Sequence, residues 1–233
     1  MIPKNIIQTY KTFDSIPERF KTFIQKIKDL HPDYNYMFYN DEDIEKFMNT
    51  NFPHLLSLYN NFKYNIQRID LFRLLVIYKY GGFYFDIDVE IIKPLDELLD
   101  NNLIFPVEFS RDALENIHSN IPKKLYSSYT IIDDNIGQYG FASEPNNDFL
   151  MFYISNIENH RIPIEYILND NKYDILSGEQ KQEYVCCTTG PRLLTLIYYE
   201  YNNKSKVTLL RNSNNKQMHF GDYGIHHCYQ SWI

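Results

Sequence analysis

Apolar and polar positions alternate between strand-like and helix-like spacing along the first half of the chain. Residues 2–10, IPKNIIQTY, are rich in β-branched side chains and predict a first strand. Residues 16–30 carry apolar side chains at helical spacing, and residues 31–41 then alternate aromatic and polar side chains as a second strand does. Asp41 is expected to cap a helix through Phe47. This order of elements predicts an α/β domain with a mostly parallel sheet.

The clearest helix is predicted at residues 64–80, and a strand follows it at once. Its apolar side chains recur every three or four residues, and Gly81-Gly82 end it because glycine adopts the left-handed turn of a helix end without steric cost. Residues 83–92 then alternate as a strand, which places Asp86 and Asp88 on one face near its end. Because ligands bind at the carboxyl ends of strands in open α/β sheets, the two aspartates form the first candidate site.

The second half of the chain is less regular. Residues 111–138 are polar and predict a loop that is mobile or contacts substrate. The segments after Pro145 and after Gly190-Pro191 each predict a turn followed by a helix. The tail, residues 219–233, holds three of the seven histidines and the only tryptophan. No repeat and no linker divides the chain, so a single domain over residues 1–233 is predicted.

Composition excludes several classes of protein. The chain has 233 residues, of which 44% are hydrophobic, and this is enough for a core and argues against disorder. A net charge of −7 argues against binding to a nucleic-acid backbone, which needs clustered Lys and Arg. Three cysteines suit neither a disulfide framework nor a zinc site. With no signal peptide and no apolar run of membrane-spanning length, the sequence predicts a soluble, cytoplasmic protein.

Two charged residues of the predicted helix add to the candidate chemistry. Asp70 and Arg73 lie three apart and share one helix face, where the plainest interpretation is an intrahelical ion pair. The helix nevertheless leads directly into Asp86 and Asp88. A guanidinium suits a diphosphate, and a carboxylate suits a sugar hydroxyl. Two carboxylates one residue apart also offer oxygen ligands to Mg²⁺ or Mn²⁺, which in turn binds a diphosphate.

Three other interpretations compete for Asp86 and Asp88. An isolated D-x-D is usually a solvated strand face. A calcium-binding loop would use the later acidic residues as well, but it needs glycine at its sixth position, where Ile91 stands, and is rejected. A phosphotransferase of the haloacid-dehalogenase type would use Asp86 as a covalent nucleophile. That interpretation employs neither charged residue of the preceding helix, but it stays open.

The segment RIDLFRLLVIYKYGGFYFDIDVEIIKPLDELL, residues 68–99, resembles the signature block of glycosyltransferase family 32, the D-x-D sugar transferases. This family is related to yeast mannosyltransferases, to capsular polysaccharide enzymes and, distantly, to clostridial glucosylating toxins. The family pattern is roughly S-D-x-x-R-x-x-x-L-x-x-x-G-G-x-Y-x-D-x-D, and Ile69 stands in place of its serine. The matching residues are Asp70, Arg73, Gly81, Gly82, Tyr84, Asp86 and Asp88.

The resemblance extends to both ends of the chain. IPKNIIQTYK is similar to the family's opening, with Ile7 in place of a histidine and Tyr10 in place of a tryptophan, and TTGPRLLT is similar to its T-G-P turn. HHCYQSW resembles the terminal H-H-x-x-G-S-W, with Gln230 in place of glycine. By this resemblance His227 is a metal ligand, and Ser231 and Trp232 close over the diphosphate. His226 is expected at most to support a ligand. The alternatives are a solvent-exposed histidine pair without a ligand role and a tryptophan that only anchors the terminus in the core.

The resemblance implies a GT-A-like, Rossmann-like α/β domain, with residues 1–100 as the nucleotide-binding half and residues 101–233 as the acceptor-side half. It implies metal-dependent, retaining transfer of a sugar from a nucleotide-diphosphate sugar to a glycan or protein acceptor, as in polysaccharide biosynthesis. The expected donor is a UDP-sugar (UDP-glucose or UDP-N-acetylglucosamine), with GDP-mannose second, and the expected cation is Mn²⁺, or else Mg²⁺.

The implied site residues fall into three sets. The catalytic residues are Asp70, Arg73, Asp86 and Asp88. The donor-binding residues are Gln8, Thr9, Tyr10, Asp70, Arg73, Tyr84, Asp86, Ser231 and Trp232, and the metal ligands are Asp86, Asp88 and His227. No nucleophile is identified, and Glu144 and Asp134 are conceivable acceptor-side groups. The substitutions Ile7 and Gln230 keep open a relative that binds a nucleotide sugar without turning it over.

Overall fold

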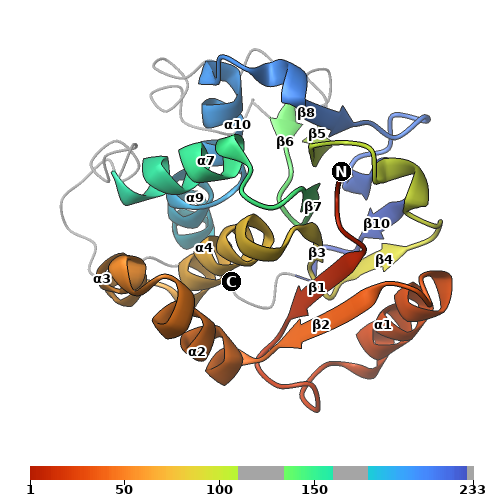
Figure 1. Cartoon of the computed structure of the whole chain (residues 1–233), viewed down its shortest axis with the longest axis horizontal. Helices are drawn as coiled ribbons and strands as arrows, with labels where there is room; N and C mark the ends of the chain where they lie inside the picture. Colours follow the sequence, from red (N-terminus) through yellow and green to blue (C-terminus); the bar gives the residue numbers. More distant parts are fainter. Residues whose placement is uncertain (110–133, 160–177, 230–233) are drawn as a thin grey trace.

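The computed structural model describes residues 1–109, 134–159 and 178–229, and the structural statements below concern these residues (Figure 1). The helices are α1 (Glu18–Leu30), α2 (Asp41–Asn51), α3 (Leu56–Asn61), α4 (Asn65–Tyr80), α7 (Asp148–Glu158), α9 (Gly178–Thr188) and α10 (Pro191–Glu200), with 3-10 turns at Pro53–Leu55, Asp96–Leu98 and Lys204–Lys206. The strands are β1 (Asn5–Thr9), β2 (Asn35–Tyr39), β3 (Gly82–Phe85), β4 (Val89–Ile91), β5 (Leu103–Phe109), β6 (Asn135–Ile136), β7 (Gly140–Ser143), β8 (Val207–Leu210), β9 (His219–Phe220) and β10 (Gly224–His226).

The main sheet has seven strands in the order β2-β1-β3-β7-β5-β6, with β8 also paired to β5. β1 is parallel to β2 and β3, and β5 is parallel to β8. β7 is antiparallel to β3 and β5, and β6 is antiparallel to β5. A smaller antiparallel sheet has the order β4-β10-β9. The predicted α/β class is therefore confirmed, with parallel pairs among β2, β1 and β3 and between β5 and β8.

Helix α4 lies at the centre of the molecule, against the main sheet and α7 (Figure 1). An apolar face was predicted for it, but every residue from Asp70 to Ile77 is at most 4% exposed, so the helix is buried all round. Gly81 and Gly82 end it with φ of 65° and 111°. A Cβ at Gly82 would lie 2.6 Å from the Asn5 backbone oxygen, so only glycine lets β3 lie this close to β1.

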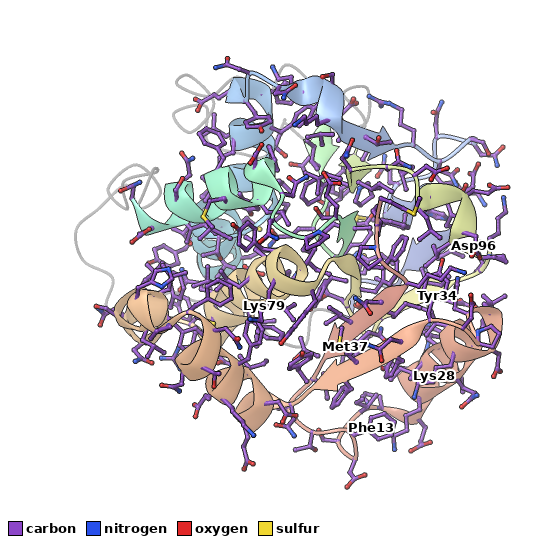
Figure 2. The ribbon with its side chains drawn as sticks, in the orientation of Figure 1. Phe13, Lys28, Tyr34, Met37, Lys79 and Asp96 are labelled. Atoms are coloured by element: carbon purple, nitrogen blue, oxygen red, sulfur yellow. The ribbon has the colours of Figure 1, made fainter. Side chains whose placement is uncertain are left out.

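The two faces of β2 separate two parts of the core. Met37 packs with the cluster of α2 and α4, whereas Tyr36 and Phe38 pack with the cluster of α1, as the aromatic alternation predicted. Figure 2 labels Met37 on one side of this strand and Phe13 and Lys28 on the other.

Two local predictions were wrong. Asn40, not Asp41, caps α2, because its side chain accepts a hydrogen bond from the backbone N–H of Asp43. The predicted strand at residues 83–92 is two strands, β3 and β4, which belong to different sheets. Within the described residues, no helix combines the length and apolarity needed to cross a bilayer. The division into donor and acceptor halves stays a prediction.

Candidate active site

A cavity of about 440 Å³ opens at the carboxyl ends of β1 and β3. Its walls come from segments far apart in the sequence: the end of β1, helix α4, the turn after β3, β5, and the tail after β10. Of the predicted site residues, seven line it, namely Thr9, Tyr10, Asp70, Arg73, Tyr84, Asp86 and Asp88. The structure therefore brings most of the predicted set to one place.

The D-x-D segment is the turn that leads from the main sheet into the small one. Asp86 directly follows β3, and Ile87 and Asp88 form the turn before β4. The backbone N–H of Asp86 donates to the Tyr139 carbonyl at 2.7 Å, and the N–H of Val89 donates to the Asp86 carbonyl at 3.0 Å. The prediction that the two aspartates share one strand face is therefore wrong, because a tight turn positions them instead.

Asp86 is held by two side chains from the main sheet and α4. The Tyr84 hydroxyl donates to Oδ1 at 2.9 Å, and Arg73 Nη1 lies 3.5 Å from Oδ2. The Arg73 guanidinium also lies over the Tyr84 ring, 5.0 Å from its centroid. Burial raises the pKa of Asp86, and the charge of Arg73 opposes that rise. The carboxylate is therefore oriented and partly neutralised by protein groups.

Asp88 is bound by the tail of the chain. Its Oδ2 accepts a hydrogen bond from the backbone N–H of Tyr229 at 2.8 Å and lies 3.4 Å from Nε2 of His226. Burial acts to raise the pKa of Asp88, but the contact and charge of His226 outweigh it and hold that pKa below its ordinary value. Burial acts to lower the pKa of His226, but Asp88 and Cys228 raise it to about 10.

Ligand atoms of Asp86, Asp88 and His226 all lie within 4.8 Å of one another. Two carboxylates and an imidazole are a suitable ligand set for Mn²⁺, and a less suitable one for Mg²⁺, which prefers oxygen ligands. Among the described residues this is the cluster with the spacing of a metal site, and it lies where the D-x-D motif predicted one.

The histidine in this cluster is His226, whereas the resemblance implied His227. β10 runs antiparallel to β4 with Ile225 opposite Glu90, so alternate tail residues point to opposite sides. His227 lies on the side of Glu90, and its Nε2 is 3.2 Å from that carboxylate. Its Nδ1 is 2.7 Å from an Arg19 Nη atom, and its ring stacks on Phe23. The backbone N–H of His227 donates to the Asp88 carbonyl at 3.0 Å, but its side chain contacts α1 and Glu90 rather than the two aspartate carboxylates.

Asp70 and Arg73 form the predicted ion pair, but inside the protein. Arg73 Nη2 lies 3.1 Å from Asp70 Oδ1, and both side chains are at most 5% exposed. Asp70 Oδ2 accepts a hydrogen bond from the Thr189 hydroxyl at 2.7 Å. Burial raises the pKa of Asp70 to about 6, although Arg73 and Thr189 both oppose the rise.

Arg73 has one further interaction with the cavity wall. Its Nη1 donates to the Gln138 carbonyl at 3.1 Å, and its buried Nε has no hydrogen-bond partner among the described residues. The guanidinium keeps its charge when buried, and it is paired with Asp70 and Asp86 through its Nη atoms.

The residues predicted to line a base pocket divide into two groups. Thr9 and Tyr10 line the cavity at the end of β1, and the half-buried Tyr10 also packs against the apolar cluster of α1. Gln8 is buried instead. Its side chain donates a hydrogen bond to the Asp86 carbonyl at 3.4 Å and accepts one from the Tyr36 hydroxyl at 3.0 Å, and it thereby supports the D-x-D turn. Ser231 and Trp232 lie outside the described residues.

The acceptor-side candidates are placed differently from expectation. Neither Glu144 nor Asp134 lines the cavity: Glu144 contacts Asn102 and the N-terminus, and Asp134 forms an ion pair with Arg211. The cavity carboxylate on that side is Glu108, which sequence reasoning missed. A single glutamate at the end of an apolar run was the only local indication of it.

Comparison with known proteins agrees with this geometry. Residues 17–105 match the family described as "Glycosyltransferase sugar-binding region containing DXD motif". The resemblance to glycosyltransferase family 32 is thereby confirmed, and the D-x-D turn, Asp70 and Arg73 all lie within the matched segment.

Two relatives are mannosyltransferases of fungi. The chain is 40% identical over 120 residues to inositol phosphoceramide mannosyltransferase 3 of Schizosaccharomyces pombe, a match that covers 52% of this chain and 32% of that protein. It is 30% identical over 211 residues to the initiation-specific alpha-1,6-mannosyltransferase of Candida albicans, covering 86% and 53%. The chain thus spans about a third of the first relative and about half of the second.

Among solved structures, the PaToxG glycosyltransferase superposes with a TM-score of 0.51 at 18% identity, covering 85% of this chain and 69% of that one. At this identity the likeness concerns the fold alone. The predicted GT-A-like fold is therefore confirmed.

Proposed function

We propose that the chain transfers a sugar from a nucleotide-diphosphate sugar to a glycan or protein acceptor in a reaction that depends on a divalent cation. The observation that carries the proposal is the cluster of Asp86, Asp88 and His226 beside the buried Arg73, in one cavity. A bound cation, Mn²⁺ in the first instance, would stabilise the charge that develops on the departing diphosphate. Asp86, Asp88 and His226 would hold it.

The remaining side chains have roles that follow from their positions. Arg73, with its unpartnered Nε, supplies a fixed positive charge for the diphosphate without reorganisation during the reaction. Asp70 accepts a hydrogen bond from a donor-sugar hydroxyl and so orients the anomeric carbon. Tyr10 stacks on the base, and Thr9 lies beside it. We also propose retention of the anomeric configuration, as the family resemblance implies.

The first donor to test is a mannosyl donor. Relatives that match this chain are named mannosyltransferases, which favours GDP-mannose over the UDP-sugars expected from the sequence. The covalent phosphotransferase hypothesis loses support, because the matched family transfers sugars and both Asp86 oxygens already contact Tyr84 or Arg73. A binding-only relative would use the same residues, so turnover decides between the two.

The experiment is a screen of GDP-mannose and UDP-sugars with Mn²⁺, measuring binding and slow donor hydrolysis. Chelator-sensitive hydrolysis of one donor supports the proposal. Asp88→Asn is expected to lose Mn²⁺-dependent donor binding with its circular dichroism unchanged, whereas Asp33→Asn, at an exposed aspartate, keeps it. Unchanged donor affinity in Asp88→Asn would contradict the assignment of the metal ligands.

A further inference from the structure

Glu108 is placed in the cavity by an irregularity of the sheet. It lies near the end of β5, where the pairing with β6 shifts register between the pairs Val107–Ile136 and Phe109–Asn135. Such bulges re-aim one side chain and are frequent beside active sites. The Glu108 carbonyl accepts a hydrogen bond from the N–H of Met218 at 3.1 Å, which fixes the backbone there. The side chain lines the same cavity as the metal-ligand cluster.

One oxygen of the Glu108 carboxylate accepts a hydrogen bond, and the other has no hydrogen-bond donor among the described residues. Asn135 Nδ2 donates to Oε2 at 2.5 Å. Asn135 is itself fixed, because its Oδ1 accepts from the Thr195 hydroxyl of α10 at 3.2 Å. Among the described residues, no group donates to Oε1. An oriented carboxylate with one free oxygen in a cavity is arranged to accept a hydrogen bond from a ligand.

The charge of Glu108 has no evident structural use. It forms no ion pair within 4 Å among the described residues, and the positive charges of Arg192 and His226 act on it only at longer range. Burial raises its pKa to about 7, with those charges and Asn135 opposing the rise. An amide or an apolar side chain at this position would cost less stability, so a role in binding or reaction is indicated.

We propose that Glu108 is the catalytic base of the sugar transfer, a role that rests on the proposed function above. Its Oε1 accepts a hydrogen bond from the acceptor hydroxyl and takes the proton as that oxygen bonds to the anomeric carbon. The bond from the anomeric carbon to the diphosphate oxygen breaks, and its electron pair leaves with the diphosphate. The proton then passes from Glu108 to solvent. Atoms and charges balance with no further reactant.

A carboxylate in this cavity has one other chemical use, which is direct attack on the anomeric carbon to form a glycosyl ester. The two roles differ in the product that a small anionic nucleophile gives when the carboxylate is removed. Azide needs no deprotonation, so in place of the acceptor it yields a glycosyl azide with the anomeric configuration of the normal product. If Glu108 is instead a nucleophile, azide takes the place of the missing carboxylate, attacks the opposite face of the anomeric carbon and yields the other anomer.

The experiment compares wild type, Glu108→Gln and Glu108→Ala with the donor that the screen identifies, and uses Glu144→Gln as a control outside the cavity. Glu108→Gln keeps the shape and an oxygen for Asn135, which protects the fold. We expect donor binding with Mn²⁺ within about twofold of wild type, and kcat for a hydroxyl acceptor lower by about 10²- to 10⁴-fold. With azide in place of the acceptor, the rate of Glu108→Ala should approach that of the wild type. Its product should have the anomeric configuration of the normal product.

Several results would overturn the base role. Wild-type kcat in Glu108→Gln, loss of donor binding in that variant, or the opposite azide anomer in Glu108→Ala would each contradict it, and the last would identify a nucleophile. These results presuppose an active wild type. If the wild type itself turns over no nucleotide sugar with any acceptor, the proposed function fails and the base role fails with it, so the two failures are distinguishable.

Discussion

The hydrogen bond from Thr189 to Asp70 joins residues 119 apart in the sequence at the base of the cavity. Thr189 is fully buried and Asp70 is 2% exposed. The Tyr153 hydroxyl donates to the Thr189 carbonyl at 2.8 Å and holds the same turn in place. Thr189→Val keeps the volume of the side chain and removes only the hydroxyl, so it isolates the contribution of this one contact to the carboxylate.

The expected size of the effect follows from the charge of Asp70. A hydrogen bond to a charged group contributes about 1.5–3 kcal/mol, whereas one between neutral groups contributes about 1 kcal/mol. The pKa of Asp70 is raised to about 6 by burial, so its carboxyl is charged at pH 8 and largely protonated at pH 5. Thr189→Val should therefore lower the free energy of unfolding by about 1.5–3 kcal/mol at pH 8 and by about 1 kcal/mol at pH 5.

The assay is urea denaturation at both pH values, with Thr188→Val as the matched control. Thr188 is the neighbouring residue, and its hydroxyl accepts from Gln67 at 2.9 Å and donates to the Tyr184 carbonyl at 2.8 Å, both neutral partners. The control should show a loss of stability that does not change with pH. A Thr189→Val deficit that is the same at pH 5 and pH 8, or below about 0.5 kcal/mol at pH 8, would refute the reasoning.

Three further predictions test the site and its frame. His226→Ala should weaken Mn²⁺-dependent donor binding at least about tenfold by calorimetry while His227→Ala changes it less than about twofold, because the loss of even a residue that only supports a metal ligand typically costs about 10- to 100-fold in metal affinity. The reverse order would restore the assignment first made from the sequence. Gly82→Ala should lower the free energy of unfolding by about 3 kcal/mol or more, since φ is 111° and the new Cβ meets the Asn5 backbone; a soluble variant with wild-type urea midpoint would count against the close approach of β1 and β3. The folded-state pKa of Glu108, about 7, lies above its ordinary 4.5, so its contribution to stability is fully present below pH 4.5 and is lost as pH rises through 7. Glu108→Gln should remove that loss and be more stable than wild type at pH 8 by about 1–3 kcal/mol; equal pH profiles of the two proteins would show that the carboxylate is not destabilised by burial.

The sequence by itself determined the local elements and the main residues of the site. Helix α4 and its glycine end follow from the spacing of apolar residues and from the freedom of glycine at positive φ, both of which act within one turn of chain. The D-x-D signature block was recognised from seven residues at fixed spacing from Asp70 to Asp88, and that spacing is also purely local. These features can be predicted without knowing which strands pair with one another.

Only the tertiary structure decided which distant side chains complete the site. The choice of His226 over His227 depends on the register of β10 against β4, and a shift of one residue would exchange the two sides. Thr189 reaches Asp70 across 119 residues, and Glu108 enters the cavity through a bulge in the pairing of β5 with β6. Register and bulges are set by the packing of whole sheets and helices against one another. The energies that fix them belong to long-range contacts, which no periodicity along the chain records.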